Sequence, residues 1–414
     1  MKNTLLIATA CLLALLSTIG ASLPYPILPP LFAAGAVNGL NSFMGLPPKL
    51  LFGIALTINP IGLMIGAALM GPLSDRYGRR PVLLSTALGA AIGHALTAWA
   101  LIIQSYPLFL FARFVTGLLE GNGAVARAML ADKLEGPLRL KAFSWLNGAF
   151  YTGWLAGPLL AGFTLQWGIT TPFWVAVVAL VIMAAMVAAA LPKEHPSTAT
   201  TSWWHVARRQ HAMNLLQHAE IRTLFIVQLA FTCGVTAFYE FYPLWLVEVA
   251  HYDARGIAWM TALLCGLMTA SSLTFAGRAS KIAPLRRAAW FAFGVAGTVA
   301  AVALGNLWIG LAAIVLFGIP NSFYNAIVPN WCADRFGHYG QGAVMGLIST
   351  IFCIANILMA LAGGVLSLID TRLVLALGAM LAAWAGWRLL RWHAVLAGED
   401  GAAAPLAVER NSSI

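Results

Sequence analysis

Residues 71–80 read GPLSDRYGRR and join two long apolar stretches of the chain. Each stretch can cross the hydrocarbon core of a bilayer, which takes about 20 residues of helix. Gly71 and Gly78 allow a tight turn and a close approach of the two helices, and Asp75 can lie at the positive N-terminal end of another helix. A plain cationic turn needs neither Asp75 nor both glycines. The stretch therefore predicts a specific contact on one face of a membrane protein.

The composition of the whole chain also indicates a membrane protein. Of its 414 residues, 60% are hydrophobic and 9% are charged, whereas soluble domains carry about 25% charged residues. We predict an all-α, polytopic protein with twelve transmembrane helices in two six-helix bundles. The predicted spans cover about residues 4–32, 49–72, 81–103, 107–131, 142–166, 171–191, 221–247, 257–277, 287–305, 307–331, 341–367 and 371–392.

The positive charges indicate the orientation of these spans. If the N-terminus is cytoplasmic, the outer loops hold three of the 24 lysines and arginines, namely Lys49, Arg255 and Arg372, while Arg113 and Arg127 lie within a span. The other nineteen lie in cytoplasmic loops and tails, as the positive-inside rule requires. The net charge of +10 therefore reflects membrane topology and not nucleic-acid binding. We expect a multi-pass protein of the cytoplasmic membrane with both termini in the cytoplasm.

One long polar connection divides the predicted spans into two sets of six. It covers residues 192–220, and Trp203 and Trp204 within it suggest a short amphipathic helix at the membrane surface. Transporters built from two related halves bind their substrate between the halves, near the bilayer midplane. We expect an N-terminal bundle, a central cytoplasmic loop, a C-terminal bundle and a cytoplasmic tail, at residues 1–191, 192–220, 221–395 and 396–414.

Catalytic and metal-binding patterns do not emerge from the sequence. No Walker A sequence is present, so an ion gradient or the substrate's own gradient would drive transport. The five cysteines lack the C-x-x-C spacing of metal sites, and no nucleophile–base pair stands out. We expect no enzymatic activity, no cofactor and no metal.

Residues 71–80 resemble the loop signature of the major facilitator superfamily, G-x-L-a-D-r-x-G-r-[RK], at every key position. The resemblance implies a two-bundle transporter similar to the twelve-span drug:proton antiporters, the tetracycline and multidrug exporters. We expect a cytoplasmic latch between the halves, in which Arg79 or Arg80 pairs with a carboxylate at the end of the fourth span. The predicted latch residues are Gly71, Asp75, Arg76, Gly78, Arg79, Arg80 and Asp132.

The fourth predicted span carries buried charge. Residues 113–117 read RFVTG, similar to the family motif R-x-x-q-G, with Thr116 in place of the usual glutamine. Glu120 and Arg127 follow Arg113 at intervals of seven, which places all three on one helix face. Charges in a membrane helix are costly and usually face a cavity or a partner. The resemblance implies that Arg113 tunes proton coupling; a buried structural pair is the alternative.

The fifth predicted span is rich in small residues. Residues 153–162 read GWLAGPLLAG and look like the antiporter motif of drug exporters, g-x-x-x-G-P-x-x-G-G, with Ala161 replacing one glycine. Small residues let a helix pack closely on a neighbour, and Pro158 bends it. The resemblance implies export, whereas an ordinary helix interface would carry no directional information. The motif residues are Gly153, Gly157, Pro158 and Gly162.

The seventh and tenth predicted spans supply candidates for a substrate cavity. Glu240 lies among aromatic residues, whose rings can stack on a cationic or amphipathic ligand while the carboxylate supplies charge. Burial favours its protonated form, which suits a proton carrier; an acid hydrogen-bonded within the bundle is the alternative. In the tenth span, amides beside prolines are typical of a cavity wall or of interhelical hydrogen bonds. The cavity candidates are Tyr239, Tyr242, Asn321, Tyr324 and Asn325.

Together these patterns predict a transporter, functional as a monomer, that exports a small amphipathic compound in exchange for protons. The first span has no acidic residue, so Glu120 or Glu240 would carry the proton, with Arg113 beside them. We expect His94 to be a core histidine whose hydrogen bonds are satisfied. Three alternatives stay open: an exporter of an endogenous siderophore, sugar or amino-acid derivative, a proton-coupled uptake symporter, and a membrane scaffold or sensor.

Overall fold

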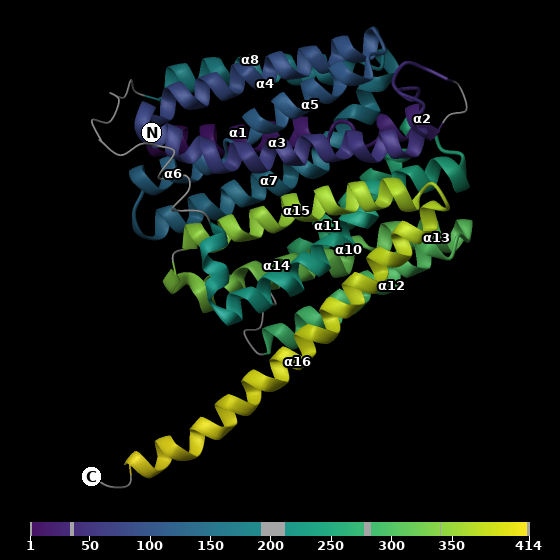
Figure 1. Cartoon of the computed structure of the whole chain (residues 1–414). Coiled ribbons are helices and arrows are strands. Elements are labelled where there is room, and N and C mark those ends of the chain that lie inside the picture. Colours follow the sequence, from purple (N-terminus) through teal and green to yellow (C-terminus); the bar gives the residue numbers. More distant parts are fainter. Residues whose placement is uncertain (1, 34–36, 192–211, 277–282, 340, 412–414) are drawn as a thin grey trace. The chain divides into compact units, whose positions relative to one another are not determined.

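The structure is a computed structural model that describes residues 2–33, 37–191, 212–276, 283–339 and 341–411, and those residues form helices and connecting turns without a β-strand (Figure 1). The α-helices are α1 Lys2–Ser22, α2 Leu28–Ala33, α3 Pro48–Tyr77, α4 Arg79–Ile102, α5 Tyr106–Glu120, α6 Gly123–Lys133, α7 Gly136–Thr164, α8 Thr171–Ala190, α10 Ala219–Ala250, α11 Ala254–Ala276, α12 Pro284–Ala303, α13 Leu307–Leu316, α14 Gly318–Phe336, α15 Gln341–Leu366 and α16 Thr371–Asn411. Short 3₁₀ turns lie at Leu165–Trp167, Ala212–Gln217 and Gly337–Tyr339.

Nine helical segments in the described part of the chain are long and apolar enough to cross a membrane. The all-helical membrane fold predicted from composition is therefore confirmed. Three further predicted spans correspond in position to α7, α11 and α12, and the total of twelve stays a prediction. The surface helix predicted around Trp203 and Trp204 lies outside the described residues.

Contacts between the helices divide the chain into two compact units. The first contains Met1–Asn214, Tyr239–Leu263 and Asn356–Val374; the second contains Leu215–Phe238, Leu264–Ala355 and Leu375–Ile414. In the first unit α1 lies along α7, α3 along α5, and α4 along both α5 and α8 (Figure 1). In the second unit α12 packs on α13 and α14. Large aromatic and branched side chains fill the interior, with Phe52, Phe109 and Phe173 among the fully buried ones.

The junction of α3 and α4 lies within the stretch GPLSDRYGRR. α3 ends at Tyr77, and Gly78 adopts a φ of 94°, a conformation that favours glycine. The Arg79 guanidinium forms an ion pair with Asp75 one turn earlier. Arg80 donates a hydrogen bond of 2.7 Å to the carbonyl of Ala188, in the last turn of α8. A cation at this end of a helix satisfies a carbonyl that has no intrahelical donor.

Three predicted spans are broken helices. The first is α1 and α2 separated by residues 23–27, where Pro24 and Pro26 remove backbone donors. The fourth breaks at Gly121 and Asn122 between α5 and α6, and the tenth breaks at Phe317 between α13 and α14. Broken helices inside a membrane protein occur where the freed backbone groups find partners in the protein or face a cavity.

The helices before the latter two breaks start in the same way. The Ser105 hydroxyl accepts a hydrogen bond from the amide of Leu108 at the start of α5. At the start of α13, the Asn306 side chain accepts one from the amide of Ile309. Both are N-caps, which satisfy one of the free donors of a first turn.

Candidate functional site

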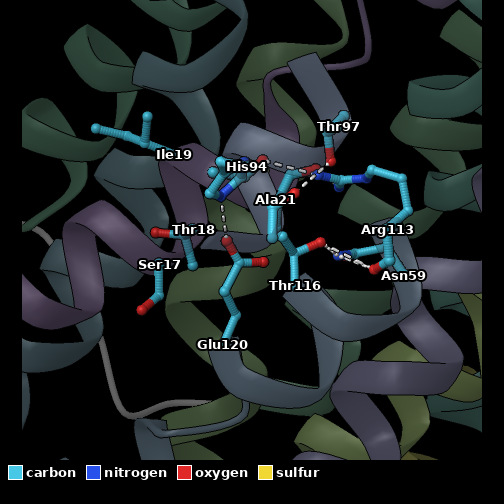
Figure 2. A network of polar contacts seen from close by, with 12 residues as sticks. Ser17, Thr18, Ile19, Ala21, Asn59, His94, Thr97, Arg113, Thr116 and Glu120 are labelled. Carbon is cyan, nitrogen blue, oxygen red and sulfur yellow. Dashed lines mark hydrogen bonds and ion pairs between the residues drawn. The ribbon is translucent and has the colours of Figure 1, made fainter. Parts of the chain in front are cut away.

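A network of buried polar side chains fills the middle of the first unit, between α1, α3, α4 and α5 (Figure 2). Arg113 lies within it on α5 and is 2% exposed. Its guanidinium donates hydrogen bonds to the carbonyls of Ala21, at 3.1 Å, and Gly20, at 3.5 Å. These carbonyls belong to the last turn of α1, where they lack intrahelical donors. Arg113 therefore supplies hydrogen-bond donors to the carbonyls at the broken end of the first span.

Thr116, which replaces the glutamine of the family motif, also belongs to this network. Its hydroxyl donates to the carbonyl of Arg113 one turn earlier, at 2.9 Å. The Asn59 amide on α3 donates to the same carbonyl, at 3.3 Å, and to the Thr116 hydroxyl, at 3.5 Å (Figure 2). Asn59 was not among the predicted site residues, although an amide within an apolar span is a signal of a buried polar contact.

Glu120 is 4% exposed, and its partner is a residue that the sequence analysis set aside. The Nε2 atom of His94, on α4, lies 2.9 Å from Oε1 of Glu120 (Figure 2). The other polar atoms of the pair, Nδ1 of His94 and Oε2 of Glu120, are buried and have no hydrogen-bond partner among the described residues. His94 is therefore a core histidine, as expected, but among the described residues only its Nε2 has a hydrogen-bond partner. The pairing depends on how α4 and α5 rotate about their axes, which the sequence does not specify.

The break that follows Glu120 is tied to two neighbouring helices. The Ser17 hydroxyl on α1 donates to Oδ1 of Asn122, at 3.2 Å. The Asn122 amide donates in turn to the hydroxyl of Thr86 on α4, at 3.5 Å. The residue at the break thus connects α1 to α4 beside the acid.

Glu240 also lies in the first unit, on α10, and is 1% exposed. Neither of its carboxylate oxygens has a hydrogen-bond partner among the described residues. Tyr25 lies within electrostatic range of both Glu240 and Arg113, and its ring packs on Trp154 of α7, with ring centroids 5.8 Å apart. An unpaired buried carboxylate is costly, and it can bind a proton or a cation.

The aromatic neighbours of Glu240 along α10 are placed differently. Phe241 packs edge-on against Phe52 of α3. The Tyr242 hydroxyl lies 2.6 Å from the hydroxyl of Thr261 on α11, and Tyr239 is half-buried. Tyr242 therefore has a polar partner within the protein, which weakens its case as a ligand contact.

The cavity candidates of the tenth span lie in the second unit. The Tyr324 hydroxyl donates to Gln228 of α10 at 2.9 Å, and its ring stacks on Phe231 with centroids 3.4 Å apart. The Asn325 amide donates to the carbonyl of Asn321 at 3.0 Å. Interhelical and intrahelical hydrogen bonds thus account for these side chains in the described structure. Their contact with a ligand stays a prediction.

Two glycines of the predicted antiporter motif, Gly153 and Gly157, face α1, whereas Gly162 lies against Ala258 of α11. Methyl groups added to Gly153 and Gly157 would overlap the hydroxyls of Thr18 and Ser22, respectively. The Ser22 hydroxyl also donates to the carbonyl of Gly153, at 3.3 Å. Pro158 is buried inside α7. The motif therefore brings α7 directly onto the helix end that Arg113 satisfies.

Charged residues at the predicted outer end of the first unit form surface contacts. Lys49, at the start of α3, pairs with Glu248 at the end of α10, with a nitrogen–oxygen distance of 2.7 Å. Asp370 precedes α16, and its carboxylate accepts hydrogen bonds from the side chain and the backbone amide of Arg372. These bonds, and the charge of Lys49 nearby, lower the pKa of the Asp370 carboxyl below its ordinary value.

The predicted latch is described only in part. The pairing of Arg79 or Arg80 with Asp132 cannot be followed, because the Asp132 side chain lies outside the described residues. The latch therefore stays a prediction. Among the residues that the structure describes, no three His, Cys, Asp or Glu side chains gather closely enough to hold a metal ion.

Comparison with known proteins connects this architecture to transporters. The chain is 32% identical over 168 residues to the class B tetracycline resistance protein of Escherichia coli, a match that covers 40% of this chain and 39% of that protein. The class C protein of Escherichia coli is 35% identical over 127 residues, or 31% of each chain. The chain thus matches less than half the length of these curated relatives.

Solved structures match over almost the whole chain. A D-xylose–proton symporter superimposes with a TM-score of 0.71 at 15% identity, covering 93% of this chain and 97% of that one. The human organic anion transporter MFSD10 superimposes with a TM-score of 0.69 at 17% identity, covering 94% and 99%. At these identities the likeness is one of fold. The family model described as Major Facilitator Superfamily matches residues 10–360, and the chain belongs to that family.

Proposed function

We propose that this protein exports small amphipathic compounds across the cytoplasmic membrane in exchange for protons, and that tetracycline is the first compound to test. Transport as such follows from the family; the direction, the coupling ion and the compound are the proposal. One proton moved through 100 mV is worth about 2.3 kcal/mol, which sustains a concentration ratio of roughly fifty.

The observation that carries the proposal is the unpaired carboxylate of Glu240. Its two oxygens are buried and without a hydrogen-bond partner among the described residues, and the carboxylate lies within electrostatic range of Tyr25, whose ring packs on Trp154. A bound proton or a cationic group on a ligand each relieves the cost of that carboxylate. Competition between the two at one acid gives an exchange of substrate for proton.

Two further observations support export. Residues 153–162 resemble the antiporter motif of drug exporters, and Gly153 and Gly157 of this motif pack closely against the end of α1. Several relatives are tetracycline resistance proteins, and resistance to a compound suggests its removal from the cell.

The test is tetracycline transport by purified protein in proteoliposomes under an imposed pH difference. We expect movement against the proton gradient in wild-type protein and its loss in Glu240→Gln, which keeps the shape of the side chain and removes its charge. Glu135→Gln is the matched control, because Glu135 is exposed in the turn before α7 and its side chain does not cap that helix. Substitution there should leave transport within about twofold, as for an ordinary surface change.

The same assay separates the alternatives. Tetracycline movement in the same direction as the protons, instead of the opposite direction, would indicate a symporter. Movement of a dedicated metabolite without movement of tetracycline would indicate a specific exporter. Transport that keeps its full pH dependence in both Glu240→Gln and Glu120→Gln would overturn the coupling part of the proposal.

A further inference from the structure

The contact between His94 and Glu120 has the features of a binding site for a proton. The side chains are 0% and 2% exposed, and they come from different helices, so the contact links α4 to α5 inside the bundle. The His94 ring also packs beside Phe173 of α8, with ring centroids 6.2 Å apart. In this conformation the pair is shielded from bulk solvent, so a change in its charge acts strongly on the surrounding helices.

The unsatisfied atoms argue against a purely structural ion pair. Buried ion pairs that stabilise a fold need hydrogen bonds to their remaining donors and acceptors. Here Nδ1 of His94 and Oε2 of Glu120 have none among the described residues. With one proton on Nε2, shared with Oε1, the pair carries one negative charge. A second proton taken from water can bind Nδ1 or Oε2, and the pair then becomes neutral.

The backbone of α1 lies directly against this pair. A methyl group on Gly20 would overlap both Oε1 of Glu120 and Nε2 of His94, so a side chain at that position cannot coexist with the bond. The carbonyls of Gly20 and Ala21 in turn accept the hydrogen bonds of Arg113. The pair and Arg113 thus hold the same turn of α1 from two directions.

Arg113 is the charged group that senses the pair. It lies two turns before Glu120 on α5 and interacts with it electrostatically. Gly20 of α1 and Phe173 of α8 lie against the pair and carry no charge. Arg113 is also contacted by the Asn59 amide and lies within electrostatic range of Tyr25. When the pair is anionic it attracts the guanidinium. When a proton neutralises it, that attraction is lost and the α1 carbonyls hold the guanidinium alone.

We propose that His94 and Glu120 together form a second proton-binding site of this transporter, and that Gly20 and Arg113 transmit its charge state to the broken end of α1. This inference rests on the proposed proton coupling and assigns different roles in it to different acidic residues. His94 and Glu120 bind a proton of their own, in addition to the proton that competes with the substrate at Glu240. The end of α1 connects the two, since Tyr25 follows it and lies within electrostatic range of Glu240.

The first test measures proton binding without any substrate. Infrared difference spectra of purified protein between acid and alkaline pH report carboxyl and imidazole bands. We expect a signal that disappears in Glu120→Gln and that also shifts or disappears in His94→Gln. His251→Gln is the control, because His251 is exposed. A Glu120 signal that is identical with and without His94 would refute the shared site.

The second test measures coupling in proteoliposomes with tetracycline as the probe. His94→Gln should lose the acceleration of tetracycline transport by a pH difference, whereas the exposed control His251→Gln should keep it. We expect a change of at least about tenfold, which corresponds to one unit in proton affinity. Gly20→Ala, which pushes the pair apart without removing either group, should reduce coupling in the same direction. Thermal melting of each variant confirms that it is folded.

The outcomes separate the two proposals. If no tetracycline moves in the wild type but the infrared signal depends on both residues, the proposed function fails and the proton site stands. If tetracycline moves and His94→Gln retains its full pH dependence, the function stands and the proton site fails.

Discussion

At the scale of single residues, the sequence predicted which side chains are costly in a membrane but not which ones meet. Arg113, Glu120 and Glu240 stood out because charge is rare in apolar helices, and all three are buried. The partner of Glu120 was missed because a contact between helices depends on their rotation and depth. A usable signal was present, since a histidine in an apolar span needs a partner as much as an acid does.

Tyr324 gives a prediction at this scale. Its hydroxyl donates a hydrogen bond to the side-chain oxygen of Gln228 in the interior of the second unit. We expect Tyr324→Phe to lower the free energy of unfolding by about 1–3 kcal/mol, because the buried Gln228 oxygen loses its donor. The stacking on Phe231 would persist, since phenylalanine keeps the ring.

Thermal melting of the detergent-solubilised protein measures this effect. Gln228→Leu removes the acceptor as well, so the double variant should recover part of the loss. A double variant that is less stable than the sum of both single changes would contradict this account of the contact.

At the scale of helices, hydropathy located the spans well and their interruptions poorly. The first span was predicted as continuous over about residues 4–32 although it contains Pro24 and Pro26, and Gly121 and Asn122 read as ordinary helix residues. The last predicted span ended at residue 392, but α16 continues to Asn411, because alanine-rich sequence favours helix whether or not it is apolar enough for lipid.

The contact of α7 with α1 can be tested by two glycines of the same helix. Gly157→Ala should destabilise the protein by about 1–3 kcal/mol, because the methyl group overlaps Ser22 in a well-packed contact. Gly148→Ala is the matched control, since a methyl group there meets nothing within 4 Å. It should be neutral, or stabilising by up to about 1 kcal/mol from helix propensity. Equal melting temperatures for the two variants would show that the α1–α7 contact tolerates side chains.

The start of α16 gives a prediction that depends on pH. Asp370 caps this helix by accepting the amide hydrogen of Arg372 at 2.8 Å. We expect Asp370→Ala to cost about 1 kcal/mol at neutral pH, the usual value of an N-cap.

Because folding lowers the pKa of this carboxyl, its ionic contribution to stability is present above the ordinary aspartate pKa and is lost as the pH falls through the lowered value. The difference in melting temperature between wild type and Asp370→Ala should therefore shrink in acid. A difference that is the same at neutral and strongly acid pH would show that the cap acts through neutral hydrogen bonding alone.

At the scale of the whole molecule, the all-helical membrane fold was the most predictable feature, whereas the number of spans and their orientation stay predictions. Charge asymmetry and hydropathy reflect the free energy of placing side chains in lipid. That free energy depends on each segment separately, so it can be read from the local sequence. The contact units follow tertiary packing instead: segments Tyr239–Leu263 and Asn356–Val374 group with Met1–Asn214. Such packing joins residues far apart in the sequence, as in the contact of Gly53 with Gly364, where added side chains would collide with backbone.

The ion pair of Lys49 with Glu248 predicts how the outer end responds to charge. Lys49→Glu places like charges together and adds repulsion from Asp370 nearby. For a partly exposed pair we expect a shift of up to about 1 kcal/mol, or roughly fivefold, toward a more open outer end.

The readout is the rate at which a membrane-impermeant maleimide labels Phe52→Cys, since Phe52 is buried nearby on α3. The exchanged pair Lys49→Glu with Glu248→Lys should restore part of the slow labelling. If the labelling rate is the same in wild type, Lys49→Glu and the exchanged pair, the Lys49–Glu248 contact does not keep the predicted outer end closed.

The hydrogen bonds of Arg113 at the end of α1 also bear on how the chain is assembled. The carbonyl of Ala21 takes its donor from a side chain 92 residues further along the chain. Until that side chain leaves the ribosome, only water can serve those carbonyls, because lipid tails offer no donors. We therefore expect the first segment to wait at the translocon or among the headgroups until α5 arrives, so that insertion proceeds by groups of helices and not one by one.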